Sequence, residues 1–151
     1  MKDLKDVKGT EYEIIVLKET WVSEERLEHF DIDWLHNIYS TQIWYMRSGG
    51  VVVYVKDHLN VTYLQKFERN AFTAIKMQII MGKQQNLSVL LLYRNCKASK
   101  MKFTQDLEGV IGNKAENQII LGDVNIILFD SVQSAEYQNL LVSLGYISLS
   151  T

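Results

Sequence analysis

Proline is absent from the sequence, and cysteine occurs once among its 151 residues. The single cysteine, Cys96, excludes an internal disulfide and favours a reducing compartment, so we expect an intracellular protein, nuclear or cytoplasmic. No apolar run approaches the roughly 20 residues of a membrane-spanning helix, and no membrane contact is predicted. The net charge is −2, which excludes a broad basic field for nucleic-acid binding and leaves only a local patch for such a contact.

Hydrophobic residues form 47% of the sequence, which is enough to bury a substantial core, and residues 1–151 are expected to form one domain. Short apolar or alternating runs predict about eight strands, at 13–17, 43–46, 51–55, 61–67, 72–81, 87–93, 118–121 and 146–149. Helical spacing and helix-start signals predict roughly three or four helices, at 1–8, 24–30, 101–111 and 131–144. The order of these elements indicates an α/β fold in which helices pack outside sheets.

Three finer expectations concern the C-terminal third of the chain. The strand at 118–121 contains three aliphatic residues in succession, and we expect it to be fully buried. Ser131 or Ser134 is expected to cap the last helix, because serine accepts a hydrogen bond from the first turn. Gly112 and Gly145 are expected to end the last two helices, because glycine adopts the left-handed backbone that helix ends use.

Polar side chains stand where three of the predicted strands end. Glu19 follows the first strand, Tyr93 and Arg94 end the strand that begins at Leu87, and Asp123 and Asn125 follow the strand at 118–121. If these strands lie side by side, two carboxylates, a phenol and an amide converge at one edge. Mg²⁺ prefers a few carboxylate oxygens and keeps several waters, so such a cluster can hold it. The metal would polarise a phosphoryl oxygen.

An ordinary turn is the alternative explanation for the segment from Gly122 to Asn125. Glycine, aspartate and asparagine are the commonest turn formers, and each has a local reason to stand there. On this hypothesis the acidic loop ends carry no chemistry.

Five stretches of the chain resemble the endonuclease/exonuclease/phosphatase family, and most closely the endonuclease domain of jockey-like non-LTR retrotransposons. The matching stretches, in the family's order, are EIIVLKETW (13–21), RSGGVVVYVKDHL (47–59), LSVLLLYR (87–94), QIILGDVNI (118–126) and EYQNLLVSLGYISL (136–149). The resemblance covers essentially the whole chain. It implies a four-layer αββα sandwich, with two packed sheets flanked by helices. It also implies hydrolysis of phosphodiester or phosphomonoester bonds with a divalent metal, Mg²⁺ or Mn²⁺.

The resemblance also implies roles for individual residues. Glu19 matches the glutamate that ligates the metal. Asp123 matches the aspartate that orients or deprotonates the attacking water, and Asn125 matches the asparagine that positions this aspartate and the phosphate. Tyr93 matches a tyrosine that stabilises the charged transition state, and Arg94 beside it is a candidate substrate contact.

Departures from the family pattern lead us to expect an incomplete domain with an impaired site. Lys18 differs from the family's usual residue before the glutamate, and Asn95 stands where the family has proline. In the family, a first strand that carries an asparagine comes before the segment that matches Met1. The family's Asp and Ser-Asp-His segments come after the segment that matches Thr151.

Three hypotheses for function follow from these patterns. The chain is a metal-dependent, DNA-nicking endonuclease domain of a retroelement, whose partner is the DNA phosphodiester backbone. Alternatively, it is a non-catalytic remnant of that domain. A third hypothesis is a small α/β interaction module whose acidic loop ends are only turns. No pattern in the sequence bears on the oligomeric state.

Overall fold

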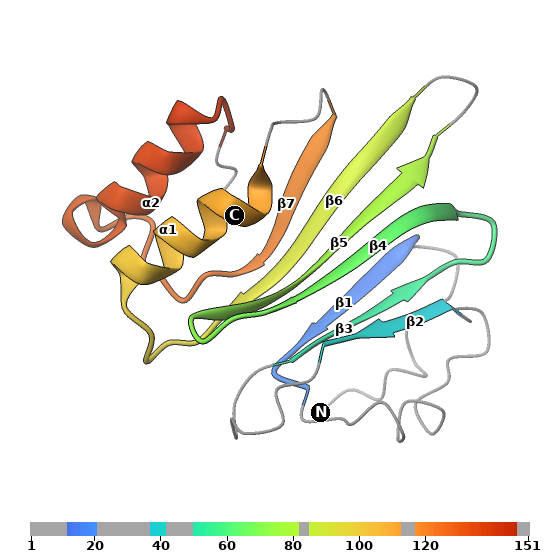
Figure 1. The fold of residues 1–151 in the computed structure, drawn as a ribbon, viewed down its shortest axis with the longest axis horizontal. Helices are drawn as coiled ribbons and strands as arrows, with labels where there is room; N and C mark the ends of the chain where they lie inside the picture. The colour runs from blue at the N-terminus through green and yellow to red at the C-terminus, as the bar shows by residue number, and fades with distance from the viewer. Residues whose placement is uncertain (1–11, 21–36, 42–49, 82–84, 113–116, 148–151) are drawn as a thin grey trace.

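The computed structural model describes residues 12–20, 37–41, 50–81, 85–112 and 117–147. This described part contains seven strands and two helices (Figure 1). In chain order they are β1 (Ile14–Lys18), β2 (Asn37–Ser40), β3 (Val51–Val55), β4 (Asn60–Glu68), β5 (Phe72–Ile80), β6 (Asn86–Arg94), α1 (Lys100–Ile111), β7 (Gln118–Asp123) and α2 (Ser131–Ser143). The mixed α/β class expected from the sequence is confirmed.

The described strands form two sheets. One has three antiparallel strands in the order β1-β3-β2. The other has four strands in the order β4-β5-β6-β7, in which β6 and β7 are parallel and the other neighbours are antiparallel. Figure 1 shows the larger sheet between the smaller sheet and the two helices. The helix α1 makes the crossover that returns the chain from β6 to its parallel neighbour β7.

Alternating side chains of the central strands build two separate cores. Between the sheets, Val51, Val53 and Val55 of β3 meet the inward residues of β5 and β6, as expected from the two-residue period of strands. The buried members of this core are Val51, Val53, Val55, Ile75, Met77, Ile79, Val89, Leu91 and Tyr93. The opposite face of the larger sheet packs on the helices through Ala71, Phe72, Ala74, Leu90, Leu92, Phe103, Leu107, Val110, Ile111, Tyr137, Leu140 and Leu141.

Three layers are therefore present in the described residues, in the order small sheet, large sheet and helices. Val52 and Tyr54 point away from the inter-sheet core and are nevertheless buried, so β3 is covered on both faces. The described part of the chain contains no fourth layer of helices. None of its helices is long and apolar enough to cross a membrane.

Helix α1 ends where the sequence predicts, at Gly112, whereas its N-terminal cap was not predicted. The side chain of Ser99 accepts a hydrogen bond from the backbone N–H of Lys102 at the start of the helix, and Gly112 follows its end with φ of 62°. The ammonium of Lys76 on β5 donates to the carbonyls of Val110 and Ile111, at 3.4 and 3.1 Å. A cation at this position satisfies carbonyls that the helix leaves open and complements the helix dipole.

Helix α2 begins differently from the prediction. Asp130 caps it, because one carboxylate oxygen accepts from the backbone N–H groups of Val132 and Gln133, at 3.1 and 3.0 Å. Ser131 is the first helical residue, and the hydroxyl of Ser134 donates back to the carbonyl of Asp130 at 2.8 Å. A carboxylate suits this position better than a hydroxyl, because its charge also interacts with the positive end of the helix dipole.

The expectation that the strand at 118–121 is fully buried was wrong. Ile119 is 43% exposed and Leu121 is 47% exposed. In the described residues β7 is an edge strand with β6 as its one neighbour, and these two side chains stay partly open to solvent. The run of aliphatic residues indicated a strand correctly, but an edge strand carries the same residues as a central one.

Other predicted elements are not described or were missed. The helices predicted at 1–8 and 24–30 and the strand at 43–46 lie outside the described residues. Tyr146 and Ile147 are not part of a strand, and the rest of the predicted strand at 146–149 is not described. The sequence pattern gave no signal for β2, which pairs with β3.

Candidate active site at the strand ends

Three strands bring the predicted site residues to one edge of the molecule. In the parallel pair of β6 and β7, Tyr93 lies directly opposite Asp123. Strand β1 of the smaller sheet contacts β7 and ends at Lys18, so that Glu19 follows at the same edge. In parallel sheets, ligands bind beyond the carboxyl ends of neighbouring strands, and the parallel pair of β6 and β7 presents Tyr93 and Asp123 at such ends.

Tyr93 and Glu19 are joined by a hydrogen bond across the two sheets. The phenol of Tyr93 donates to Oε1 of Glu19 at 2.7 Å. Burial and the hydrogen bond to the Glu19 carboxylate raise the pKa of Tyr93 to about 12. A hydrogen bond with the Asn125 side chain lowers this pKa by a smaller amount. The phenol therefore keeps its proton at neutral pH and remains a hydrogen-bond donor.

Both carboxylate oxygens of Asp123 have partners. Oδ2 accepts a hydrogen bond from the ammonium of Lys18, and Oδ1 accepts one from the backbone N–H of Asn125 at 2.9 Å. Burial by itself would raise the pKa of Asp123, but these two hydrogen bonds and the charge of Lys18 outweigh burial and lower the pKa. Asp123 is therefore ionised at neutral pH.

Asn125 and Arg94 hold each other in place through the backbone. The carboxamide of Asn125 donates to the carbonyl of Arg94 at 2.6 Å. The guanidinium of Arg94 donates to the carbonyls of Val124 and Asn125, at 3.3 and 3.0 Å, and also to the carbonyl of Ala98. The loop that carries Asn125 is thus tied to the end of β6 in both directions.

Arg94 does not face the same side of the sheet as Tyr93. Its side chain is 2% exposed and lies on the helix side, where the guanidinium stacks over the ring of Phe103 at 5.6 Å. Its Nη1 and Nη2 atoms already serve backbone carbonyls, and its Nε is buried without a hydrogen-bond partner among the described residues. Arg94 therefore does not reach the open edge where the substrate contact predicted from the sequence would be made. The structure gives it a supporting role beneath the loop after β7.

Backbone strain coincides with two of the predicted site residues. Within the described residues, Glu19 and Asn125 are the non-glycine residues with positive φ, at 54° and 49°. L-residues avoid this left-handed region, and for glutamate it is particularly uncommon. Such residues concentrate at functional sites, where the surrounding structure enforces an otherwise unfavourable conformation. Sequence reasoning selected both residues but gave no signal for their backbone conformation.

Gly122 allows β7 to approach β6 closely just before Asp123. A Cβ atom built on Gly122 would lie 1.9 Å from the carbonyl oxygen of Leu92. No side chain is compatible with that distance, so the glycine of the Gly-Asp-Val-Asn segment fixes where Asp123 emerges. The turn hypothesis explained Gly122 as a common turn former, whereas the structure explains it by interstrand distance.

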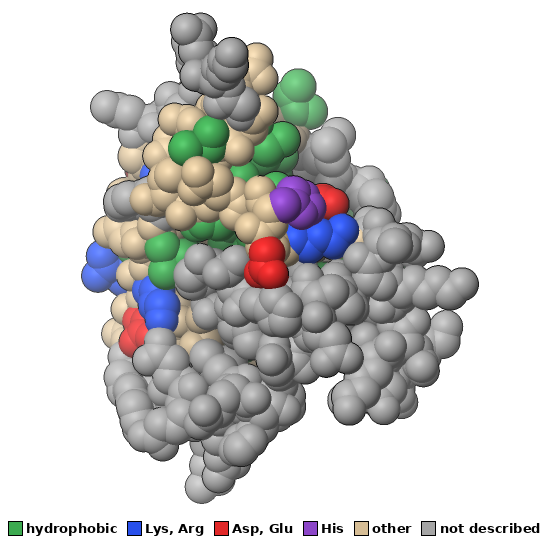
Figure 2. Space-filling model, turned by 90° about the vertical axis from the view of Figure 1, so that its right-hand side faces the viewer, with side chains coloured by type: hydrophobic (Ala, Val, Ile, Leu, Met, Phe, Trp, Pro, Cys, Tyr) green, Lys and Arg blue, Asp and Glu red, His purple; other side chains and the backbone are tan. Residues whose placement is uncertain are grey.

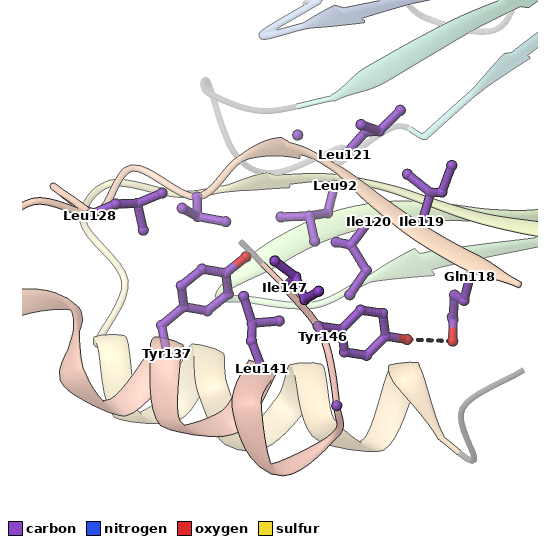
Figure 3. A pocket seen from close by; sticks show the side chains of 13 residues that line it. Leu92, Gln118, Ile119, Ile120, Leu121, Leu128, Tyr137, Leu141, Tyr146 and Ile147 are labelled. Carbon is purple, nitrogen blue, oxygen red and sulfur yellow. Dashed lines mark hydrogen bonds between the residues drawn. The ribbon is translucent and has the colours of Figure 1, made fainter. Parts of the chain in front are cut away.

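A cavity of about 460 Å³ lies beside this site, between β7 and α2. Figure 3 shows Leu92 and Ile120 pointing toward α2, while Ile119 and Leu121 point to the other side of β7. The phenol of Tyr146 donates to the side-chain oxygen of Gln118 at its rim. The lining is largely apolar and includes none of the five predicted site residues, so the cavity is not the place where the polar groups converge.

Charged side chains elsewhere on the described surface occur in small mixed groups. On the face in Figure 2, basic, acidic and histidine side chains stand next to one another among apolar patches. Glu13, for example, pairs with Lys56 at 3.0 Å and with His58 at 2.7 Å. That face shows no wide basic field among the described residues, so contact with a polyanion there would depend on individual cations.

The donor atoms at the strand ends suit a hard divalent cation. Glu19 and Asp123 offer carboxylate oxygens and Asn125 a carboxamide oxygen, which are the ligand types that Mg²⁺ prefers. No group of three or more acidic, histidine or cysteine side chains assembles within the described residues. A metal here would therefore take two carboxylates at most and complete its coordination with waters, as Mg²⁺ commonly does.

Comparisons with known proteins add no relative. No protein-family model matches the chain, and no characterised protein matches it in sequence.

Proposed function

We propose that this chain is a metal-dependent phosphodiester hydrolase domain of the endonuclease/exonuclease/phosphatase type, which acts on DNA. The observation that carries the proposal is the convergence of Glu19, Tyr93, Asp123 and Asn125 at one edge, although they come from positions up to 106 residues apart in the chain. The left-handed backbone of Glu19 and Asn125 supports it further. A group of ordinary turns would not require these residues to meet.

We also propose the four-layer sandwich that belongs to this type of enzyme. Two packed sheets with α1 and α2 on the larger one supply three of the layers. The burial of Val52 and Tyr54 on the outer face of β3 is what a covering layer on the smaller sheet would produce. The hydrophobic residues of β3 on both faces agree with a strand that is covered on both sides.

Each residue has a distinct role in the proposed reaction. Glu19 and Asp123 would hold the divalent cation, which supplies polarisation of a phosphoryl oxygen when bound. Asp123 is ionised and orients the attacking water. Asn125 holds the loop in register through its bond to the carbonyl of Arg94. Tyr93 stays protonated, and its one O–H, which donates to Glu19 in this structure, would turn to the charge that develops on the phosphate. Such a donor typically contributes on the order of 3 kcal/mol.

Plasmid nicking tests this proposal directly. Purified protein with Mg²⁺ is expected to convert supercoiled plasmid to the nicked form, and Asp123→Asn is expected to abolish this conversion. Asp106→Asn is the matched control, because Asp106 also pairs with a lysine, Lys102 at 2.8 Å, but lies in α1 away from the strand ends. Equal nicking by the unmodified chain and Asp123→Asn would refute the assignment.

A non-catalytic member of the same fold is the second candidate. The ion pair between Lys18 and Asp123 favours it, because the ammonium of Lys18 stands where a cation or a water would approach Oδ2 of Asp123. Mg²⁺ binding can be monitored by tryptophan fluorescence. Saturable binding that is lost in Glu19→Gln, together with an absence of nicking, would support this second candidate over the first.

A further inference from the structure

Lys18 introduces a positive charge into a site that is otherwise suited to a cation. It is the last residue of β1, and its ammonium is hydrogen-bonded to Oδ2 of Asp123, 105 residues away in the chain. The Lys18 side chain is 57% exposed and that of Asp123 is 27% exposed. The ion pair therefore lies at the open side of the site, where a solvated cation can reach the same carboxylate oxygen.

Charges within this cluster cancel. Glu19 and Asp123 contribute two negative charges, and Lys18 and Arg94 contribute two positive ones. Arg94 is buried and its guanidinium is committed to backbone carbonyls. Lys18, by contrast, has a flexible and exposed side chain, so its charge is the one that can leave.

An ammonium and a divalent cation compete for Oδ2 of Asp123. Both need the lone pairs of the same oxygen, and they repel each other at the short distances of coordination. Oδ1 keeps a lone pair beside the hydrogen bond from the backbone N–H of Asn125, but it belongs to the same carboxylate, so a cation there is also repelled by Lys18. A divalent cation is thus expected to bind Asp123 more tightly once Lys18 swings away.

We propose that Lys18 is a built-in competitor of the divalent cation and sets the metal affinity of the site. This inference depends on the proposed function, because it assumes that Glu19 and Asp123 are metal ligands. Lys18 acts through Asp123, so it is a positioning residue and not a catalytic one. The competition lowers affinity for the metal without removing any oxygen donor from the site.

Mn²⁺ titration, followed by electron paramagnetic resonance of the free ion, tests the competition. Lys18→Met is expected to bind Mn²⁺ about tenfold more tightly than the unmodified chain, which corresponds to about 1.4 kcal/mol. Lys18→Arg keeps the charge and is expected to bind Mn²⁺ as the unmodified chain does. Lys102→Met is the control, because its ion pair with Asp106 has similar exposure, 62% and 21%, and its removal is expected to leave the Mn²⁺ affinity unchanged.

The outcomes separate this inference from the proposed function. In one outcome, Mn²⁺ binding is lost in Glu19→Gln but has equal strength in the unmodified chain and in Lys18→Met. This result would refute the competition by Lys18 and leave the proposed metal site intact. Absence of binding in every variant, with the fold retained by circular dichroism, would overturn both. Tighter binding in Lys18→Met and in Lys102→Met alike would assign the effect to net charge and would also overturn the competition.

Discussion

Substitution of Gly122 by alanine is expected to detach the end of β7 from β6. Gly122 lies opposite Leu92 in the parallel ladder. The new methyl group would lie 1.9 Å from the carbonyl oxygen of Leu92 and 2.8 Å from its carbonyl carbon. These are backbone atoms of β6, a strand that pairs on both sides, so β7 has to move and to carry Asp123 with it.

The expected loss of stability follows from two contributions. Overpacking of a well-packed region typically costs about 1–3 kcal/mol, and each interstrand hydrogen bond that breaks costs about 1 kcal/mol more. Together they give about 3 kcal/mol, a large part of the roughly 5–15 kcal/mol that holds a domain folded. For a chain of this size, that loss lowers Tm by about 10 °C.

Urea and thermal unfolding, followed by circular dichroism, measure this effect. Gly109→Ala is the control, because Gly109 lies within α1 and an added Cβ there meets nothing within 4 Å. It is expected to raise the free energy of unfolding by about 1 kcal/mol, since alanine is a better helix former. If Gly122→Ala unfolds within about 0.5 kcal/mol of the unmodified chain, a typical effect of an innocuous substitution, the close approach of β7 to β6 is refuted.

Two further perturbations test other parts of the structure. Because the pKa of Tyr93 is raised to about 12, the folded chain keeps a proton that the unfolded chain loses above its ordinary pKa of about 10. The free energy of unfolding is therefore expected to fall as pH rises from about 10 to 12, by at most about 3 kcal/mol. Urea unfolding of Tyr93→Phe over this pH range is expected to show a smaller fall. An equal fall in Tyr93→Phe and in the unmodified chain would contradict the raised pKa of Tyr93. Lys76→Met removes the ammonium that donates to the carbonyls of Val110 and Ile111 and is expected to cost about 1 kcal/mol. Amide hydrogen exchange is expected to speed up in the last turn of α1 and not in its first, and unchanged protection there would count against the cap.

The strands and their faces could largely be predicted from the sequence, because side-chain periodicity is a local property. The valines of β3 alternate between the inter-sheet core and the opposite face, as the two-residue period requires. The exposure of Ile119 and Leu121 could not be predicted in the same way. Whether a strand is central or at an edge depends on the sheet order, and the sequence of β7 carries no mark of it.

The candidate site was predictable in its members but not in its connections. Glu19, Tyr93 and Asp123 each follow an apolar run, which is visible in the sequence. The ion pair of Asp123 with Lys18 depends on the packing of β1 against β7, and no local pattern encodes it. Arg94 was assigned to the substrate because it neighbours Tyr93, yet adjacent residues of a strand point to opposite faces.

Positive φ at Glu19 and Asn125 sets stability against function at these two positions. Glycine adopts this backbone conformation without steric cost, so a laboratory selection for thermal stability alone would favour glycine at both. The same selection would delete one carboxylate and one carboxamide from the strand ends. A more stable variant obtained in this way would keep its sheets and lose the groups that distinguish this edge from any other.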